Sequence, residues 1–212
     1  MDYQSFKSAV QGLPVFSGRD AARLGEPKTM YNQLANWRRK GLVSQLRRGL
    51  YVLGKADRRI EPGVMFLSGQ LYAPSYVSLE YALGVHGLIP ELVTSVTAVT
   101  TRNTAGFSND FGRFQYQHIK REAFRGFTLV KDAAGAGYFL ALPEKAVVDF
   151  IYLNLPRFER GDREVFTRSY RFQNLETLDT GRLKAYGALF ANKKLGEIVG
   201  GLCRLVREER KR

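Results

Sequence analysis

Apolar residues recur at helical spacing at the start of the chain. Tyr3, Phe6 and Val10 lie three and four residues apart, which places them on one face of a helix over residues 3–12. Ser17 follows, and its side-chain oxygen is placed to cap a second short helix. The pattern therefore predicts two short helices in the N-terminal part of the chain.

A third helix is expected between Pro27 and about Gly41. Proline suits the first turn of a helix because its missing N–H would have no partner there, and glycine is typical just beyond a helix end. Met30, Leu34 and Trp37 form the apolar stripe of this helix. Its remaining surface carries amide and cationic side chains.

The stretch SQLRRGLYVL, residues 44–53, has the pattern of a β-hairpin. Two short apolar runs flank Gly49, which suits a tight reversal of the chain, and Arg47 and Arg48 stand directly before that glycine. Three helices followed by a hairpin are the element order of a winged helix-turn-helix. Alternation leaves open which face of the hairpin meets the core: Leu50 and Val52, or Tyr51 and Leu53.

A polar segment with proline and glycine, residues 55–63, indicates a domain boundary. We therefore expect an α+β chain, with a winged helix-turn-helix DNA-binding domain over residues 1–58 and a mixed α/β domain with a helical C-terminal part over residues 59–212. The second domain should hold strands near 95–101, 112–119, 126–132 and 137–142, and helices near 64–71, 78–87, 143–156, 179–190 and 193–211, with Ser78 as the cap of the second helix.

Positive charge is concentrated at the two ends of the chain. The sequence has 33 Lys and Arg against 20 Asp and Glu, a net charge of +13. Residues 1–59 carry 12 basic and 4 acidic residues, or +8, and residues 168–212 carry 11 and 5, or +6. Such a distribution favours a polyanionic partner, either nucleic acid or acidic lipid.

Other compositional features favour a cytoplasmic protein with no membrane partner. No run approaches the roughly 18–20 apolar residues of a membrane span, and the N-terminus lacks the apolar core of a signal peptide. The single cysteine, Cys203, cannot form an intrachain disulfide, which fits a reducing compartment. It lies on an apolar helical pattern and is expected to be buried.

The polar face of the third helix mixes the side chains that read bases with those that bind phosphates. Asn and Gln pair with adenine edges, whereas Arg and Lys suit guanine or phosphate. We expect bases to be contacted by Thr29, Asn32, Gln33 and Asn36, and phosphates by Arg38, Arg39 and Lys40. The hairpin arginines should reach phosphates or the minor groove. The predicted DNA-binding set is Lys28, Thr29, Asn32, Gln33, Asn36, Arg38, Arg39, Lys40, Arg47 and Arg48.

Catalytic and metal chemistry have little support in the sequence. Two histidines and one cysteine are too few for a zinc-finger site, and no phosphate-binding glycine motif is present, so we expect no metal and no cofactor. A Mg²⁺-dependent nuclease using Glu144, Lys145 and Asp149 is the enzymatic alternative. The two acids are five residues apart on one predicted helix and diverge by roughly 140°, which disfavours a shared metal ion.

A third alternative is a protein-binding module in the C-terminal part. An apolar stripe there could dock on the protein's own core, dimerise the protein or contact a partner; it consists of Leu195, Ile198, Leu202 and Leu205.

Several longer stretches resemble one protein family. They are APSYVSLEYALGVHGLIPE (73–91), VTAVTTRNTAGF (96–107), FGRFQYQHIK (111–120) and LPEKAVVDFIYL (142–153), together with the hairpin stretch GLVSQLRRGLYVL. The resemblance is to the AbiEi-type antitoxin and transcriptional regulator family of type IV toxin–antitoxin systems.

This resemblance implies a repressor of its own promoter that binds double-stranded DNA through the winged helix, commonly at inverted repeats and as a homodimer. It also implies a nucleotidyltransferase-like toxin partner, AbiEii, with which the antitoxin need not form a stable complex. The remainder of the chain would carry the antitoxic activity. Some family members are solitary regulators, and no catalytic residue is carried over.

Overall fold

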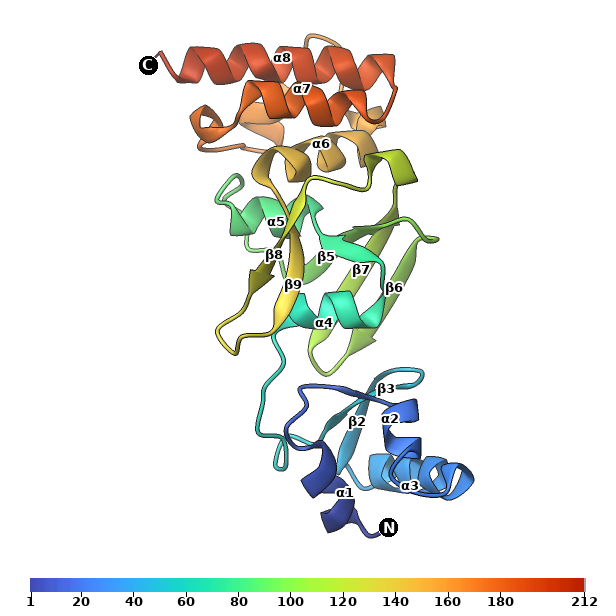
Figure 1. The fold of residues 1–212 in the computed structure, drawn as a ribbon. Coiled ribbons are helices and arrows are strands. Elements are labelled where there is room, and N and C mark those ends of the chain that lie inside the picture. The colour runs from blue at the N-terminus through green and yellow to red at the C-terminus, as the bar shows by residue number, and fades with distance from the viewer. Residues whose placement is uncertain (212) are drawn as a thin grey trace.

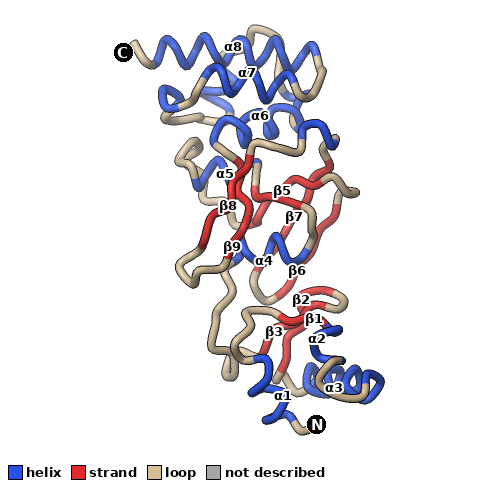
Figure 2. Tube along the Cα trace, viewed as in Figure 1, coloured by secondary structure: helices blue, strands red, loops and turns tan. Residues whose placement is uncertain are grey.

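Two β-sheets, each with its own helices, follow one another along the molecule (Figure 1). The computed structural model describes residues 1–211. The N-terminal helices lie at one end, the larger sheet lies in the middle, and the C-terminal helices lie at the other end (Figure 2). The chain is thus a mixed α+β protein, as the sequence predicts.

The N-terminal part contains three helices and a three-stranded sheet with strand order β1-β3-β2. The strands pair antiparallel, and β2 and β3 form the predicted hairpin. The elements are α1 (Tyr3–Val10), β1 (Phe16–Ser17), α2 (Gly18–Ala22), α3 (Pro27–Arg39), β2 (Val43–Arg47) and β3 (Leu50–Leu53).

Side-chain caps set where these helices begin. The Ser17 hydroxyl oxygen accepts a hydrogen bond from the Asp20 backbone N–H at 3.1 Å, and the Asp20 carboxylate accepts one from the Ser17 backbone N–H at 2.8 Å. This reciprocal pair is a capping box and confirms Ser17 as the cap of α2. At α3, Pro27 occupies the first turn, and Glu26 accepts from two backbone N–H groups.

The helices and the small sheet enclose a core of their own. The predicted stripe of Met30, Leu34 and Trp37 is buried in it, which confirms the orientation of α3. Aromatic rings fill its centre, where the Phe6 ring lies 4.6 Å from that of Trp37 and 5.4 Å from that of Phe16. The buried members of this N-terminal core are Phe6, Val10, Phe16, Ala21, Met30, Leu34, Trp37, Val43 and Leu53.

The larger sheet has six strands in the order β6-β7-β5-β4-β9-β8. Two of its pairings, β5 with β7 and β4 with β9, are parallel, and the others are antiparallel. The strands are β4 (Ser75–Val77), β5 (Ser95–Thr100), β6 (Ala105–Asn109), β7 (Gly112–His118), β8 (Phe127–Lys131) and β9 (Gly137–Ala141). The four predicted strands are confirmed, and β4 and β6 are additions that the sequence pattern did not predict.

Helices cover both faces of this sheet. The Tyr116 hydroxyl of β7 donates to the Ser68 carbonyl oxygen of α4 at 2.7 Å. On the opposite face of β5, the Thr97 hydroxyl oxygen accepts from the Tyr81 backbone N–H of α5 at 3.0 Å. These helices are α4 (Val64–Leu71), α5 (Leu79–Val85) and α6 (Pro143–Leu153), and α6 packs beside α5.

The C-terminal part is helical and docks on α6. Its long helices, α7 (Thr180–Ala188) and α8 (Lys193–Glu209), pack against each other, and α7 packs on α6. All four residues of the predicted stripe are buried in the large core, so its docking on the protein's own core is the alternative that the structure supports: Leu195, Ile198, Leu202 and Leu205. Cys203 is buried, as predicted. Short helical turns complete the chain: Arg121–Ala123, Leu155–Arg157, Val165–Ser169 and Leu175–Thr177.

A buried polar cluster links α6 to the sheet. The Lys145 and Asp149 side chains are fully buried and form an ion pair. The Asp149 carboxylate also accepts hydrogen bonds from the Tyr76 hydroxyl at 2.8 Å and the Ser78 hydroxyl at 2.9 Å. Ser78 occupies the N-cap position of α5, as predicted, but its hydroxyl donates to Asp149 and makes no capping hydrogen bond.

The same cluster decides against the nuclease alternative. Burial raises the pKa of the Asp149 carboxyl and lowers the pKa of the Lys145 ammonium, although their mutual attraction opposes both shifts. Glu144 is also buried, and one of its oxygens accepts from the Asp179 backbone N–H at 2.9 Å. A nucleic-acid phosphate has no access to side chains in this position.

Residues 1–211 offer neither a metal site nor a membrane span. No group of three or more His, Cys, Asp and Glu side chains in this range is arranged to hold a metal ion. Within the same range, every helix is too short or too polar to cross a membrane.

The cluster gives a direct stability prediction. Asp149→Ala should lower the free energy of unfolding by about 3–5 kcal/mol, because it leaves the Lys145 ammonium buried without a partner. Combining it with Lys145→Met should restore part of that loss, since no charge then remains in the core. Urea unfolding followed by circular dichroism measures both changes. An equal loss in the single and double variants would show that the ion pair is not the cause.

Candidate nucleic-acid interface

The predicted DNA-binding residues lie on α3 and at the turn of the β2–β3 hairpin. Nine of the ten side chains are exposed, and Gln33 is half-buried. The exposed ones are Lys28, Thr29, Asn32, Asn36, Arg38, Arg39, Lys40, Arg47 and Arg48.

The centre of the exposed α3 face is set by the geometry of the helix. Successive residues are about 100° apart, so the positions opposite the buried stripe of this helix are those of Lys28, Asn32 and Arg39. Asn36 lies next to Arg39, whose guanidinium donates to the Asn36 side-chain oxygen. This contact holds the two side chains together at the C-terminal end of the face.

Gln33 departs from the expected outward orientation. Its side-chain oxygen is buried and has no hydrogen-bond partner among the described residues. A buried acceptor without a partner costs about 1–3 kcal/mol, so the amide gains from any donor that reaches it. A base contact by Gln33 stays a prediction, and it would need this side chain to rotate outward.

One flank of α3 is joined to the hairpin. The Arg38 guanidinium donates to the Gln45 side-chain oxygen on β2. Nearer the start of α3, the Tyr31 ring is so close to Gly18 that a Cβ atom there would lie 3.0 Å from it. The Gly18 N–H in turn donates to the carbonyl oxygen of Gly49 at 2.9 Å. The α3 face and the hairpin turn therefore form one surface around the start of α2.

Tyr31 belongs to this surface but was not among the predicted residues. Its side chain is 48% exposed, and it lies between Lys28 and Arg38 along the flank that faces the hairpin. Its position three residues after Lys28 is the signal that could have identified it. A tyrosine next to the buried Met30 suits a core position equally well, so the pattern alone does not decide.

Both faces of the β2–β3 hairpin are covered. Tyr51 and Leu53 pack on the N-terminal core, whereas Leu50 and Val52 belong to the core of the larger part. Alternation could not decide between the two pairs because each pair meets a core. Gly49, with a φ of +79°, makes the reversal in a conformation that glycine adopts without strain.

A β-bulge directs one more side chain toward the larger sheet. The register shifts between Gln45 and Arg47, which leaves Leu46 without a partner on β3. The Leu46 side chain enters the large core, and its carbonyl oxygen accepts from the Asn109 side-chain nitrogen at 3.3 Å. Burial raises the pKa of the Tyr116 hydroxyl on β7 to about 12, and the positive charge of Arg47 opposes part of that rise.

The segment after the hairpin is fastened on both sides. The Asp57 carboxylate accepts from the Tyr3 hydroxyl at 2.6 Å and pairs with the Lys7 ammonium of α1 at 2.5 Å. The Arg58 guanidinium lies 4.9 Å from the centre of the Phe111 ring, in the turn between β6 and β7. The candidate interface is thereby held in a fixed orientation to the larger sheet.

The part of the chain that carries the candidate interface matches a known protein family. Residues 4–54 match the family model described as transcriptional regulator, AbiEi antitoxin. The match begins in α1 and ends just after β3, which confirms the predicted resemblance for this part of the chain. The resembling stretches between residues 73 and 153 lie outside the matched range. No curated protein matches the chain.

The contacts of Asp57 predict a pH-dependent stability. The hydrogen bonds from Lys7 and Tyr3 lower the pKa of the Asp57 carboxyl below 3.8. The stabilisation they give is therefore present above about pH 4 and is lost as the pH falls through the lowered pKa. Asp57→Asn should lower stability at about pH 7, and its difference from wild type should shrink toward pH 3.

Urea unfolding followed by Trp37 fluorescence measures this difference. Asp110→Asn, which changes an exposed acid in the turn between β6 and β7, is the matched control and should leave stability unchanged. An Asp57→Asn effect of constant size across the pH range would contradict the assignment.

Proposed function

We propose that this protein is a non-enzymatic transcriptional regulator that binds double-stranded DNA in a sequence-specific way. One observation carries the proposal: the exposed face of α3 and the arginine-bearing turn of the β2–β3 hairpin form one surface, in a part of the chain with a charge of +8. Six of the ten predicted positions are lysine or arginine, which suits the negatively charged DNA backbone.

The element order supports a winged helix-turn-helix over residues 1–58. In such domains the recognition helix enters the major groove, which is about 12 Å wide and admits one helix. Here α3 takes that role, α2 precedes it across the turn, and the β2–β3 hairpin is the wing. We propose residues 59–212 as the second domain.

The positions on α3 suggest a division of roles. Asn32 lies at the centre of the exposed face, where an amide can pair with both hydrogen-bonding groups of an adenine edge. Lys28 and Arg39 lie on either side of it along the helix and suit phosphates or guanine. Arg47 and Arg48 would contact the backbone beside the groove and so fix how the domain is oriented on DNA.

The match to the antitoxin family supports a wider role. We propose that the protein represses its own promoter at inverted repeats, as a homodimer on DNA, and counteracts a nucleotidyltransferase-like toxin through residues 59–212. The support is the match at residues 4–54 and the resembling stretches of the second domain. A solitary regulator without a toxin is the alternative proposal.

The DNA-binding surface predicts two distinct kinds of variant. Replacing Arg47 and Arg48 together with alanine should weaken binding to every sequence and reduce the salt dependence of the affinity. With about four to six phosphates neutralised, log K should fall with log salt at about −4 to −5, and each lost contact should reduce that slope by about 1. Asn32→Ala should instead cost about 1–3 kcal/mol on the operator alone.

Fluorescence anisotropy with the DNA upstream of the gene and a shuffled duplex separates the two effects. Arg157→Ala, which removes an exposed cation outside this surface, is the control and should change neither affinity nor slope. If Asn32→Ala weakened binding to both duplexes equally, α3 would not be reading bases.

The antitoxin proposal makes a separate prediction. If a toxin gene adjoins this one, co-expression should rescue the growth of cells that express the toxin. The two proteins should still elute independently in size-exclusion chromatography at micromolar concentrations. Absence of growth rescue would contradict the antitoxin role and leave the DNA-binding role standing.

A further inference from the structure

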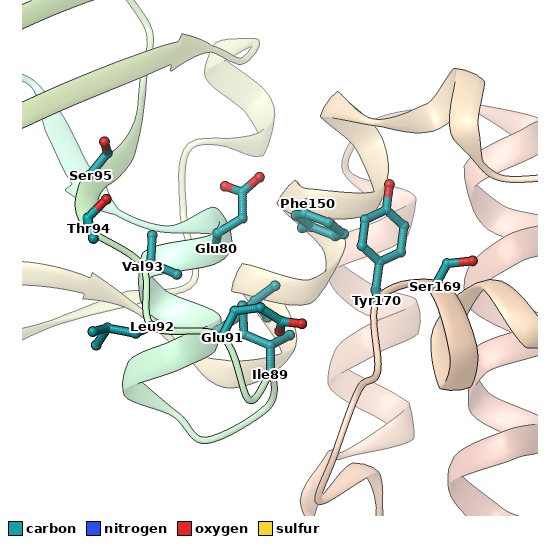
Figure 3. A pocket seen from close by; sticks show the side chains of 11 residues that line it. Glu80, Ile89, Glu91, Leu92, Val93, Thr94, Ser95, Phe150, Ser169 and Tyr170 are labelled. Atoms are coloured by element: carbon teal, nitrogen blue, oxygen red, sulfur yellow. The ribbon is translucent and has the colours of Figure 1, made fainter.

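A cavity of about 440 Å³ lies between α5 and the C-terminal part of the chain (Figure 3). Its walls are the loop that joins α5 to β5, the side of α6, and the segment around Tyr170. Apolar side chains dominate this lining, and the Phe150 and Tyr170 rings face the loop from the other side. The volume falls within the roughly 300–1,000 Å³ of ordinary small-molecule sites.

A smaller, polar cavity of about 140 Å³ adjoins the apolar one. The two share Glu80, and they are built from neighbouring positions of the same elements: α5, β5 and α6. The hydrogen-bonding groups around the smaller cavity are Thr97, Gln115, Gln117 and Asn154. Together the cavities form a site with an apolar chamber at one end and a polar chamber at the other.

Two carboxylates line the site, and only one of them is neutralised. Glu91 is paired with the Arg171 guanidinium at the edge of the larger cavity. Glu80 has no hydrogen-bond or ion-pair partner among the side chains of residues 1–211. Figure 3 shows its carboxylate between Ser95 at the start of β5 and the Phe150 ring of α6. Among residues 1–211, no lysine or arginine lines either cavity.

We propose that this site binds a small organic cation that carries an apolar or aromatic arm. The ammonium group of the ligand would pair with the Glu80 carboxylate at the junction of the two chambers. The amide oxygens of Gln115 and Gln117 would accept its remaining N–H groups, and the arm would lie against Phe150 and Tyr170.

The lining selects this ligand class over the others. An anion would meet the Glu80 carboxylate without any cation to offset the repulsion. A neutral ligand that displaced water would leave that carboxylate poorly solvated, which is costly unless a donor replaces the water. A cation offers a charge-assisted hydrogen bond, which is about twice as strong as a neutral one. This site is separate from α3 and the hairpin, so the inference does not depend on DNA binding.

Three indole compounds of nearly equal shape test the proposal. Tryptamine is the cation, indole-3-ethanol is its neutral counterpart, and indole-3-acetate is the anion. Isothermal titration of the full-length protein should show saturable tryptamine binding at least tenfold tighter than that of indole-3-ethanol, a difference of about 1.4 kcal/mol. Indole-3-acetate should bind most weakly.

Matched variants locate the binding. Glu80→Gln should weaken tryptamine binding at least tenfold and leave indole-3-ethanol binding unchanged, with an unaltered unfolding midpoint as the test of folding. Glu122→Gln changes an exposed carboxylate in the turn Arg121–Ala123, outside both cavities, and should preserve tryptamine binding. Equal affinities for the three compounds, an undiminished affinity in Glu80→Gln, or no saturable tryptamine binding would each overturn the proposal.

Discussion

The β2–β3 hairpin has no free face, and the rest of the structure depends on that constraint. One face packs on the N-terminal core through Tyr51 and Leu53, and the other packs on the larger core through Leu46, Leu50 and Val52. Burial of one aliphatic side chain stabilises the fold by about 1.5–3 kcal/mol. Separating the hairpin from the larger sheet would expose several aliphatic side chains at once, so the loss of stability would be several times that value. The turn that carries the two arginines is therefore positioned by both parts of the protein. The surface proposed to bind DNA is thus coupled to residues 59–212 through packed side chains.

The sequence predicts those elements whose signals agree at several levels. For α3, a proline in the first turn, an apolar stripe and a terminal glycine all point to the same helix, and the structure confirms it. The unpredicted strands lack such agreement, because β4 has three residues and β6 contains glycine, serine and asparagine. Each becomes a strand by pairing with neighbours that are distant in the chain or across a turn. The role of Asp149 could not be predicted for the same reason, because its partners Tyr76 and Ser78 lie more than seventy residues earlier in the chain.

Only the part of the candidate interface that follows from the geometry of one helix could be predicted from the sequence. The stripe of α3 fixes the centre of its outer face, so the exposure of Asn32 follows from the sequence. The flanks depend on what packs beside the helix. Tyr31 lies exposed beside the start of α2, and Gln33 is half-buried on the opposite flank. Both faces of the hairpin are buried because the larger sheet packs on one of them. The residue pattern of a single strand gives no information about that packing.

If α3 and the hairpin read a specific DNA sequence, as proposed, the protein must discriminate between duplexes of equal composition. The most direct test is the ratio of dissociation constants for two duplexes of equal composition at physiological salt. One duplex is taken from upstream of the protein's own gene, and the other is a shuffled version of it. Specific regulators typically bind their operators 10³-fold or more tightly than other DNA. We expect a ratio of about that size, whereas a ratio near one would contradict sequence-specific binding.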